Sequence, residues 1–293
     1  MHEIRRKLIN TKEKKILLIV LDGLGGLPFP LKTELDAAKT PNLNKLIKKS
    51  ETGAHIPISN GLTPGSGSAH LALFGYDPLR FNVGRGVLEA LGLDIKITNK
   101  DLAIRGNFAT VKKVGTRLIV SDRRAGRIDT KSNKRIVNTL KQNIKKIGNV
   151  LVDFESGLEH RFVCKLRFNK KLSYEQCLIS DTDPQEVGVS PLKPRNLNKK
   201  SLNLSKIIQM LINKISKTLI KEKKANYALL RGFSTYPEIP TFNELYNLNA
   251  CSITTYPMYK GISSLVGMTP ISSVGISIGS QVDALRKAYP KYN

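Results

Sequence analysis

Continuous apolar runs stand near the two ends of the chain, whereas alternating apolar and polar positions fill its middle. The run KILLIVL at Lys15–Leu21 is rich in Ile, Leu and Val, which is typical of a parallel strand buried on both faces. Ala54–Ile58 and Ala250–Thr255 predict two further short strands. We therefore expect an α/β fold whose parallel sheet draws its strands from both ends of the chain.

The middle of the chain, residues 81–235, has the pattern of a separate α+β domain. Its apolar stretches predict strands, most of them with one polar face, at Leu93–Ile97, Leu102–Val111, Arg117–Ser121, Val150–Phe154, Phe162–Phe168 and Ala225–Leu230. Apolar residues recur at helical spacing in Ser132–Ile147 and Leu202–Ile220. We expect this domain to interrupt a parent domain of residues 15–80 and 236–293, with residues 1–14 as a basic N-terminal arm.

Two turns in the first part of the chain predict helix starts. Thr40-Pro41 places a cap residue before a proline at the first helical position. The stretch TPGSGSAHLALFGYDP turns before Ser66 and then becomes apolar, so Ser66 should lie at or near a helix N-terminus. Backbone N–H groups at such an end favour an anion and ease ionisation of a nearby hydroxyl. Ser66 is then either a nucleophile or phosphate-binding residue, or only a helix cap with a partly exposed His70 beside it.

The charge of the chain is strongly basic but scattered. It has 48 Lys and Arg against 23 Asp and Glu, a formal net charge of +25. Such a charge suits nucleic acid, an anionic membrane or phosphorylated substrates. The lysines are spread along the chain, however, and no basic stripe is interleaved with aromatic residues. We therefore expect solvated basic faces and regard a nucleic-acid partner as the weakest interpretation.

Cysteine usage and the apolar stretches indicate a reducing, aqueous compartment. The cysteines Cys164, Cys177 and Cys251 are widely spaced and form no CxxC pair, which argues against a disulfide framework or a zinc knuckle. The first apolar run is too short for the core of a signal peptide. The stretch Gly261–Gly279 is broken by a proline and several serines, so it is a poor membrane span. We expect a cytoplasmic protein without a membrane partner.

A carboxylate at a strand end and a serine at a helix tip suit metal-assisted phosphoryl transfer. Asp22 follows the first predicted strand, where ligands gather in open α/β sheets, unless it only closes a turn. A divalent cation shared with Ser66 would activate the hydroxyl. Arginines would hold the phosphate and carboxylate groups of a substrate. The middle domain offers Arg105, Arg123, Arg124, Arg127, Arg161 and Arg231, three of which also fit a basic surface loop at Ser121–Arg127.

Long strings of the sequence resemble one known family, the archaeal type of 2,3-bisphosphoglycerate-independent phosphoglycerate mutase in the alkaline phosphatase superfamily. They include ILLIVLDGLGG, GLTPGSGSAHLALFGYDP, DLAIRGNFATV, DRRAGRI, EHRFV, SDTDP, LLRG and YPMYKGISSLVGM. The strings keep the order of the family and lie between Lys15 and Met268. The resemblance implies an alkaline-phosphatase-like α/β fold, a parallel sheet with helices that an inserted α+β domain interrupts.

The resemblance also implies an activity and a site. The activity is an isomerase reaction of glycolysis, the interconversion of 3-phosphoglycerate and 2-phosphoglycerate through a phosphoserine intermediate, without 2,3-bisphosphoglycerate as cofactor. Ser66 would be the nucleophile, and Asp22 and Ser66 would bind divalent metal, with manganese foremost and magnesium as the alternative. The implied substrate-binding residues, placed by chemistry and motif, are Arg105, Arg123, Arg124, Arg127, Arg231 and Lys260. Asp181 and Asp183 lie in a matching string without an assigned role.

Some metal ligands that the resemblance implies have no counterpart in this sequence. Family members complete a two-metal site near the C-terminus with Asp and His residues, including an Asp-His-Ser-Thr-Pro string. The histidines here are His2, His55, His70 and His160, and that string does not occur. We therefore expect a truncated chain with an incomplete parent sheet, inactive alone, whose missing part could lie on a separate chain. The alternative function is a catalytically dead fragment that binds phosphorylated metabolites.

Overall fold

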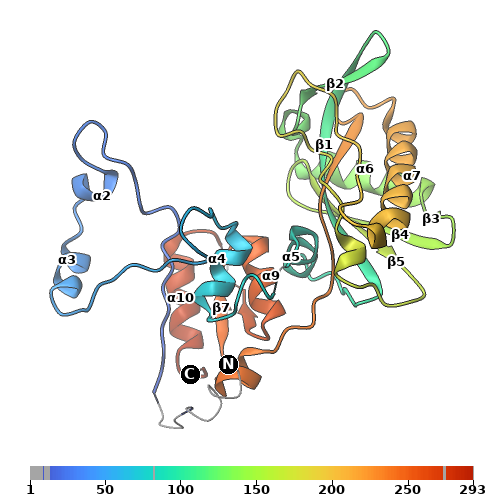
Figure 1. Cartoon of the computed structure of the whole chain (residues 1–293). Coiled ribbons are helices and arrows are strands. Elements are labelled where there is room, and N and C mark those ends of the chain that lie inside the picture. Colours follow the sequence, from blue (N-terminus) through green and yellow to red (C-terminus); the bar gives the residue numbers. More distant parts are fainter. Residues whose placement is uncertain (1–8, 10–13, 82, 273–274, 293) are drawn as a thin grey trace.

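The computed structural model describes residues 9, 14–81, 83–272 and 275–292, so the predicted basic arm lies outside it except for residues 9 and 14. Figure 1 shows two lobes and a segment that projects away from them. The helices are α2 (Glu34–Ala37), α3 (Pro41–Ile47), α4 (Ser66–Leu73), α5 (Arg85–Gly92), α6 (Thr130–Asn143), α7 (Leu202–Leu219), α8 (Phe242–Tyr246), α9 (Pro257–Leu265) and α10 (Ile278–Ala288). The strands are β1 (Asp101–Val114), β2 (Arg117–Asp122), β3 (Lys146–Ile147), β4 (Val150–Ser156), β5 (Arg161–Arg167), β6 (Tyr227–Thr235), β7 (Cys251–Ile253) and β8 (Thr269–Ile271).

The larger lobe is built on a six-stranded sheet with the order β2-β1-β5-β4-β3, in which β6 also pairs with β1. All of its pairs are antiparallel. The structure confirms five of the six strands predicted in the middle of the chain, as well as the helices α6 and α7. The strand predicted at Leu93–Ile97 is wrong: after α5 the backbone turns through Asp94, at a φ of 59°, and Ile97 is buried without joining a strand.

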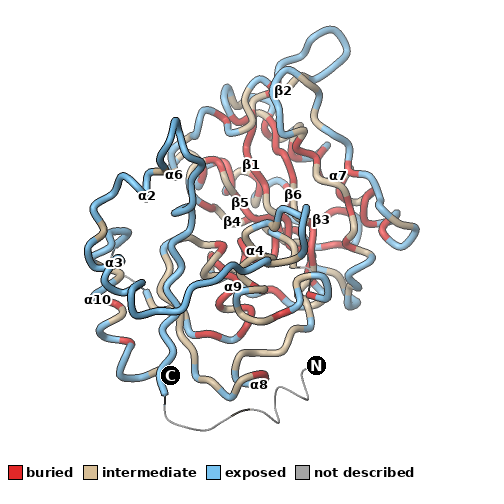
Figure 2. The backbone as a smooth tube through the Cα atoms, turned by 60° about the vertical axis from the view of Figure 1, so that its left-hand side comes forward, coloured by how far each residue is buried: buried red, intermediate tan, exposed pale blue. Residues whose placement is uncertain are grey.

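The two faces of this sheet carry different residues. On one face Leu102, Ile104 and Phe108 of β1 are fully buried in the main core, together with the periodic apolar residues of α6 and α7. Figure 2 shows this core as the dense buried region around β1, β5 and β6. The intervening residues Arg105 and Asn107 point to the opposite face, since side chains alternate along a strand. That face packs against α5, which also packs against α9 of the smaller lobe.

The smaller lobe combines a short parallel sheet with helices. Its strands β7 and β8 pair in parallel over three residue pairs. Its core joins Leu71 of α4 and Leu88 of α5 to Met258 and Ile262 of α9. The structure thus confirms the strand predicted within Ala250–Thr255, of which Cys251–Ile253 forms β7. Helix α9 matters most for the site, because it carries Tyr259 and Lys260.

Glycines allow α5 and α9 to approach each other closely. A Cβ atom at Gly261 of α9 would overlap the carbonyl oxygen of Leu88, and one at Gly92 of α5 would overlap the carbonyl oxygen of Pro257. Both obstacles are backbone atoms, which cannot move away as the end of a flexible side chain can. The two helices therefore pack backbone to backbone, and this contact joins the smaller lobe to the helix that covers the arginine-bearing face of the sheet.

The N-terminal parallel strand predicted at Lys15–Leu21 is wrong for this structure. The segment has no regular secondary structure, and Ile16, Leu18 and Leu21 are 67%, 55% and 54% exposed. The strand predicted at Ala54–Ile58 is also absent. A buried parallel strand needs hydrogen-bonded neighbours at its edges and helices over its faces, and among the described residues the β7–β8 pair does not extend to this segment. Figure 2 shows it as a largely exposed tube.

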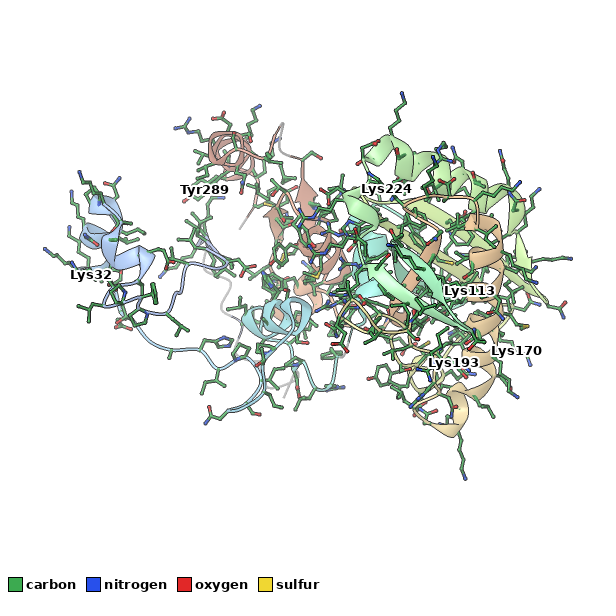
Figure 3. The ribbon with its side chains drawn as sticks, turned by 90° about the horizontal axis from the view of Figure 1, so that it is seen from above. Lys32, Lys113, Lys170, Lys193, Lys224 and Tyr289 are labelled. Atoms are coloured by element: carbon green, nitrogen blue, oxygen red, sulfur yellow. The ribbon has the colours of Figure 1, made fainter. Side chains whose placement is uncertain are left out.

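The basic residues are spread over the surface, as the sequence predicts. In Figure 3 Lys113, Lys170, Lys193 and Lys224 lie on the larger lobe, and Lys32 lies on the projecting segment. Among the described residues these lysines belong to separate parts of the surface, which agrees with solvated basic faces. Among the described residues, no helix combines the length and apolarity that a membrane crossing would require.

Candidate functional site

Ser66 is the first residue of α4, as its sequence context predicts. Gly65 precedes it in extended conformation, with φ −70° and ψ 157°, and no side chain caps the helix. The N–H groups of the first turn therefore keep hydrogen-bonding capacity that a capping side chain would otherwise use. One turn later, Nδ1 of His70 lies 2.8 Å from the carbonyl oxygen of Ser66. The imidazole of His70 stacks on the ring of Tyr259 with centroids 4.5 Å apart.

Tyr259 brings the two residues of the predicted reaction centre together. Its hydroxyl donates a hydrogen bond to Oδ2 of Asp22 and also interacts with the side chain of Ser66. The bond to Asp22 raises the pKa of Tyr259, and burial adds to this, whereas the bond to Ser66 lowers it. Two groups that hydrogen-bond one atom lie within roughly 6 Å of each other. Asp22 and Ser66 thus share one phenol, although Asp22 stands in a turn before Gly23 and follows no strand.

A row of cationic side chains crosses the face of the sheet that looks toward α5. Arg105 on β1 is paired directly with Arg231 on β6, and Asn107 on β1 is paired with Arg161 on β5. Directly opposed residues lie on the same face of an antiparallel pair. The sheet register therefore aligns three guanidinium groups from three strands, which we call the arginine row: Arg161, Arg105 and Arg231.

Several buried polar atoms in this region have no partner among the described residues. They are Nε of Arg105, Nε of Arg161, Oδ1 of Asn107 and Nδ1 of His160. Buried donors without acceptors are costly. Glu89 of α5 is the nearest counterion, with Oε2 3.8 Å from Nη1 of Arg105. A single carboxylate at that distance leaves donors free for a bound anion.

The electrostatics of the row agree with an excess of positive charge. Burial lowers the pKa of Arg105; Glu89 opposes this effect and the charges of Arg161 and Arg85 add to it. Burial, followed by the charge of Arg161, lowers the pKa of His160 to about 4, so its imidazole is neutral at pH 7. Burial and the neighbouring arginines disfavour the positive charge of Arg105, and an anionic ligand would stabilise that charge.

Two tyrosines of the α9 region connect the row to the serine. The guanidinium carbon of Arg161 lies 6.0 Å from the ring centroid of Tyr256. The rings of Tyr256 and Tyr259 have centroids 5.5 Å apart. Tyr259 in turn contacts Asp22 and Ser66. Successive contacts through these two tyrosines therefore connect the nucleophile candidate to the arginine row.

Arg123 and Arg231 are held by two acidic residues. Asp183 accepts hydrogen bonds from Nε and Nη2 of Arg123, at 2.8 and 2.9 Å, and from Nη1 of Arg231 at 3.3 Å. Asp181 accepts from Nε of Arg231 at 3.1 Å and from the N–H of Gly232 at 2.9 Å. Two arginines and two carboxylates balance in charge, so this group adds no net positive charge to the site.

The other predicted substrate-binding residues are less closely grouped. Arg124 is exposed and follows Arg123 in the chain, and its charge helps to lower the pKa of His160 after burial and the charge of Arg161. Arg127 is exposed in the turn that follows. Lys260 forms an ion pair of 2.6 Å with Asp94 and lines a separate cavity of about 290 Å³ beside β7 and β8.

The described residues do not complete a divalent-metal site. They offer the carboxylate of Asp22 and the hydroxyl of Ser66, and no cluster of three His, Cys, Asp or Glu side chains occurs among them. Manganese and magnesium bind through more oxygen or nitrogen ligands than these two residues provide. His70 is engaged with the backbone of Ser66. The metal that the family resemblance implies therefore has two potential ligands here and no complete shell.

Sequence reasoning missed four residues of this site: Tyr256, Tyr259, His160 and Glu89. Tyr256 and Tyr259 belong to the string YPMYKGISSLVGM, but only Lys260 of that string was predicted to bind substrate. Arg161 was among the available arginines but was not selected. The alternation of β1 and β5 could have found it, because Arg105, Asn107 and Arg161 occupy positions that face away from the apolar core.

Comparisons with known proteins agree on one family. The family model described as 2,3-bisphosphoglycerate-independent phosphoglycerate mutase matches residues 48–226. A protein of Aquifex aeolicus named probable 2,3-bisphosphoglycerate-independent phosphoglycerate mutase is 50% identical over 292 residues, which cover 99% of this chain and 72% of the relative. A protein of the same name from Thermus thermophilus is 44% identical over 294 residues, covering 99% and 71%.

A solved structure shows the same likeness in three dimensions. The cofactor-independent phosphoglycerate mutase of Thermoplasma acidophilum superposes with a TM-score of 0.62 at 28% identity, over 93% of this chain and 73% of that one. The mixed α/β architecture matches the fold that the sequence predicts. The chain therefore belongs to the family of 2,3-bisphosphoglycerate-independent phosphoglycerate mutases, which are isomerases.

Proposed function

We propose that this chain carries the nucleophile and the substrate-binding arginines of a reaction that interconverts 3-phosphoglycerate and 2-phosphoglycerate in glycolysis. The observation that carries the proposal is the contact of Ser66 and Asp22 with one phenol, connected through Tyr256 to an arginine row with unpartnered donors. The second functional candidate is a fragment that binds phosphorylated metabolites without catalysis. It uses the same arginines, but Ser66 does not take up a phosphoryl group.

The proposed step transfers the phosphoryl group in two halves. In the first half the Ser66 hydroxyl gives up its proton as its oxygen bonds to phosphorus, the bond between phosphorus and the substrate oxygen breaks, and that oxygen takes up a proton. In the second half the neighbouring hydroxyl of glycerate gives up its proton as it bonds to phosphorus, the bond between phosphorus and the Ser66 oxygen breaks, and Ser66 regains a proton. The start of α4 stabilises negative charge on the serine oxygen. The carboxylate of Asp22 accepts a hydrogen bond from the hydroxyl of Tyr259, which orients the phenol oxygen toward Ser66.

The arginines are proposed to hold the two anionic ends of the substrate. Arg105 and Arg161 supply buried donors without partners, and Arg231 extends the row. Arg123, Arg124 and Arg127 come from one loop beside it, whereas Lys260 approaches from α9. All of these residues remain candidates, and Arg105 is the foremost, because its Nε is buried without a hydrogen-bond partner and its counterion Glu89 is 3.8 Å away.

The metal-dependent part of the proposal has a definite consequence. When bound, manganese or magnesium would lower the barrier by stabilising the serine alkoxide and the phosphoryl oxygens. Asp22 and Ser66 alone would bind such an ion weakly. We therefore expect only background turnover from this chain by itself. A separate chain that supplies further ligands has no support from the structure or the comparisons, and it is not part of the proposal.

Two further elements belong to the proposal. The chain is divided into a discontinuous parent domain of residues 15–80 and 236–293 and an inserted substrate-binding domain of residues 81–235; α5 is the element that packs against both lobes. The reaction would take place in the cytoplasm, where a glycolytic enzyme finds its substrates and where the cysteines Cys164, Cys177 and Cys251 would stay reduced.

Calorimetric titration with 3-phosphoglycerate tests the binding part of this function. We expect measurable binding by the wild-type chain and at least about tenfold weaker binding by Arg105→Ala, because a charged hydrogen bond contributes about 1.5 kcal/mol or more. Arg117→Ala is the matched control, since Arg117 is exposed at the start of β2. Equal affinities of the two variants would contradict the proposed substrate site.

Mass spectrometry tests the chemical part. After incubation with 3-phosphoglycerate and manganese, phosphate on Ser66 that is absent from Ser66→Ala would support the phosphoserine step. A coupled mutase assay on the same samples should show background turnover. Turnover well above background that Ser66→Ala abolishes would refute the expectation that the chain is inactive alone. Binding without any phosphorylation of Ser66 would favour the non-catalytic candidate.

A further inference from the structure

The loop that carries three of the proposed substrate-binding arginines is held in an unusual conformation. Ala125, Gly126 and Arg127 have φ values of 50°, 63° and 49°. The left-handed region costs roughly 1 kcal/mol for each residue other than glycine. A run of three such residues persists only where other contacts hold it. Some of the stabilising contacts are local: the carboxylate of Asp122 accepts hydrogen bonds from the backbone N–H groups of Arg124 and Gly126, both at 2.7 Å.

The other anchor of this loop comes from a distant part of the chain. Asp183 lies sixty residues after Arg123 and is 2% exposed. Both of its oxygens bind the guanidinium fork of Arg123. One of them also accepts from Arg231, the member of the arginine row on β6. The N–H of Gln185 donates to the other oxygen at 2.9 Å, so the carboxylate is fully used.

These contacts join the loop to the sheet through one buried carboxylate. We propose that Asp183 is a positioning residue: it ties Arg123 to Arg231 and thereby holds the neighbouring Arg124 beside the arginine row, where it can reach an anionic ligand. In this arrangement Arg123 serves mainly as the anchor, because its Nε and Nη2 are occupied. The inference rests on the proposed function, since it takes the arginine row as the substrate site.

The charge state of Asp183 agrees with this role. Burial by itself would raise the pKa of Asp183. The hydrogen bonds from Arg123 and Gln185 and the charges of Arg123 and Arg231 outweigh burial, and the pKa is lowered. Asp183 is therefore ionised throughout the physiological range, and the tie between loop and sheet does not depend on pH there.

The variant Asp183→Asn tests the inference, with Glu222→Gln as its matched control. Glu222 also binds an arginine fork through both oxygens, at 2.7 Å each from Arg135, but away from the arginine row. Hydrogen exchange of residues 122–127 should be faster in Asp183→Asn and unchanged in Glu222→Gln. Titration with 3-phosphoglycerate should show at least about tenfold weaker binding for Asp183→Asn, because small misplacements of a positioned group are costly.

A double variant separates positioning from a general loss of structure. If Asp183 acts through Arg124, adding Asp183→Asn to Arg124→Ala should not weaken 3-phosphoglycerate binding further. A full additional loss in the double variant would overturn the inference. So would tighter binding by Asp183→Asn, because that result would make Asp183 a competitor of the ligand for the arginines.

Two outcomes remain to be distinguished. If Asp183→Asn does not fold, Arg123→Lys breaks the same bidentate contact at a partly exposed side chain and should give the same faster exchange and weaker binding; unchanged behaviour of Arg123→Lys would overturn the inference. If the wild-type chain does not bind 3-phosphoglycerate, the proposed function fails. The anchoring of the loop is then still decided by hydrogen exchange, and unchanged exchange in Asp183→Asn refutes it.

Discussion

The substitution Gly261→Ala probes the contact that joins the two halves of the site. Gly261 lies in α9, two residues after Tyr259, and its Cα faces the carbonyl oxygen of Leu88 in α5. A methyl group there overlaps that oxygen, so the helices must separate by about 1 Å or more to restore a van der Waals distance. Helix α5 also packs against β1, so a separation would move the smaller lobe away from the arginine row.

The expected magnitude follows from two opposing effects. Overpacking against backbone on a tight helix crossing costs about 3 kcal/mol, the upper end of the usual range. Replacing a helical glycine by alanine contributes about 1 kcal/mol in the opposite direction. The net loss is about 2 kcal/mol, which lowers the melting temperature of a domain of this size by about 4–8 °C.

Differential scanning calorimetry measures this effect, and Gly279→Ala is the control. Gly279 is also helical, in α10, but the nearest heavy atom to its added Cβ is 3.9 Å away. It should therefore be neutral or slightly stabilising, through helix propensity alone. A Gly261→Ala protein that melts at or above the wild-type temperature, in parallel with Gly279→Ala, would refute the backbone-to-backbone packing of α5 and α9.

Two further predictions concern titratable groups. His160 is neutral in the folded protein because burial and neighbouring arginines lower its pKa to about 4, so its contribution to stability is complete above its ordinary pKa and is lost as the pH falls toward 4. Unfolding in urea should show a loss of about 2 kcal/mol between pH 7 and pH 5, which His160→Gln should remove; equal pH profiles would contradict this. Burial raises the pKa of Cys177 to about 12 and also raises that of Cys164. A thiol reagent at pH 8 should therefore modify the less buried Cys251 first, and rapid reaction of all three thiols in the native protein would disprove the buried placement.

Local patterns predicted much of the larger lobe. The alternation along residues 102–111 and 162–168 places Leu102, Ile104 and Phe108 in the core, because side chains point to opposite faces of a strand. Helical spacing in the same way predicted α6 and α7. The start of α4 at Ser66 followed from a turn before an apolar segment. These features depend on neighbours within a few residues, which the sequence displays directly.

The first apolar run shows the limit of this reasoning. Its composition is that of a buried strand, and the structure leaves it exposed and without regular secondary structure. Composition predicts that a segment can form a strand when neighbouring strands hydrogen-bond to it. Whether such neighbours are present depends on the rest of the fold. A strand without hydrogen-bonded neighbours has no ladder to stabilise it, whatever its β propensity.

The sequence by itself determined the family of this chain, most strands and the two long helices of its larger lobe, and the serine at the start of α4. The tertiary structure alone decided which of the many arginines stand together. Sheet register brings Arg161, Arg105 and Arg231 into one row, and Tyr259, which lies 237 residues after Asp22 in the chain, joins Asp22 to Ser66. The physical reason is that these contacts join residues distant in the chain, whose proximity is set by strand pairing and helix packing and leaves no periodic signal in the order of the residues.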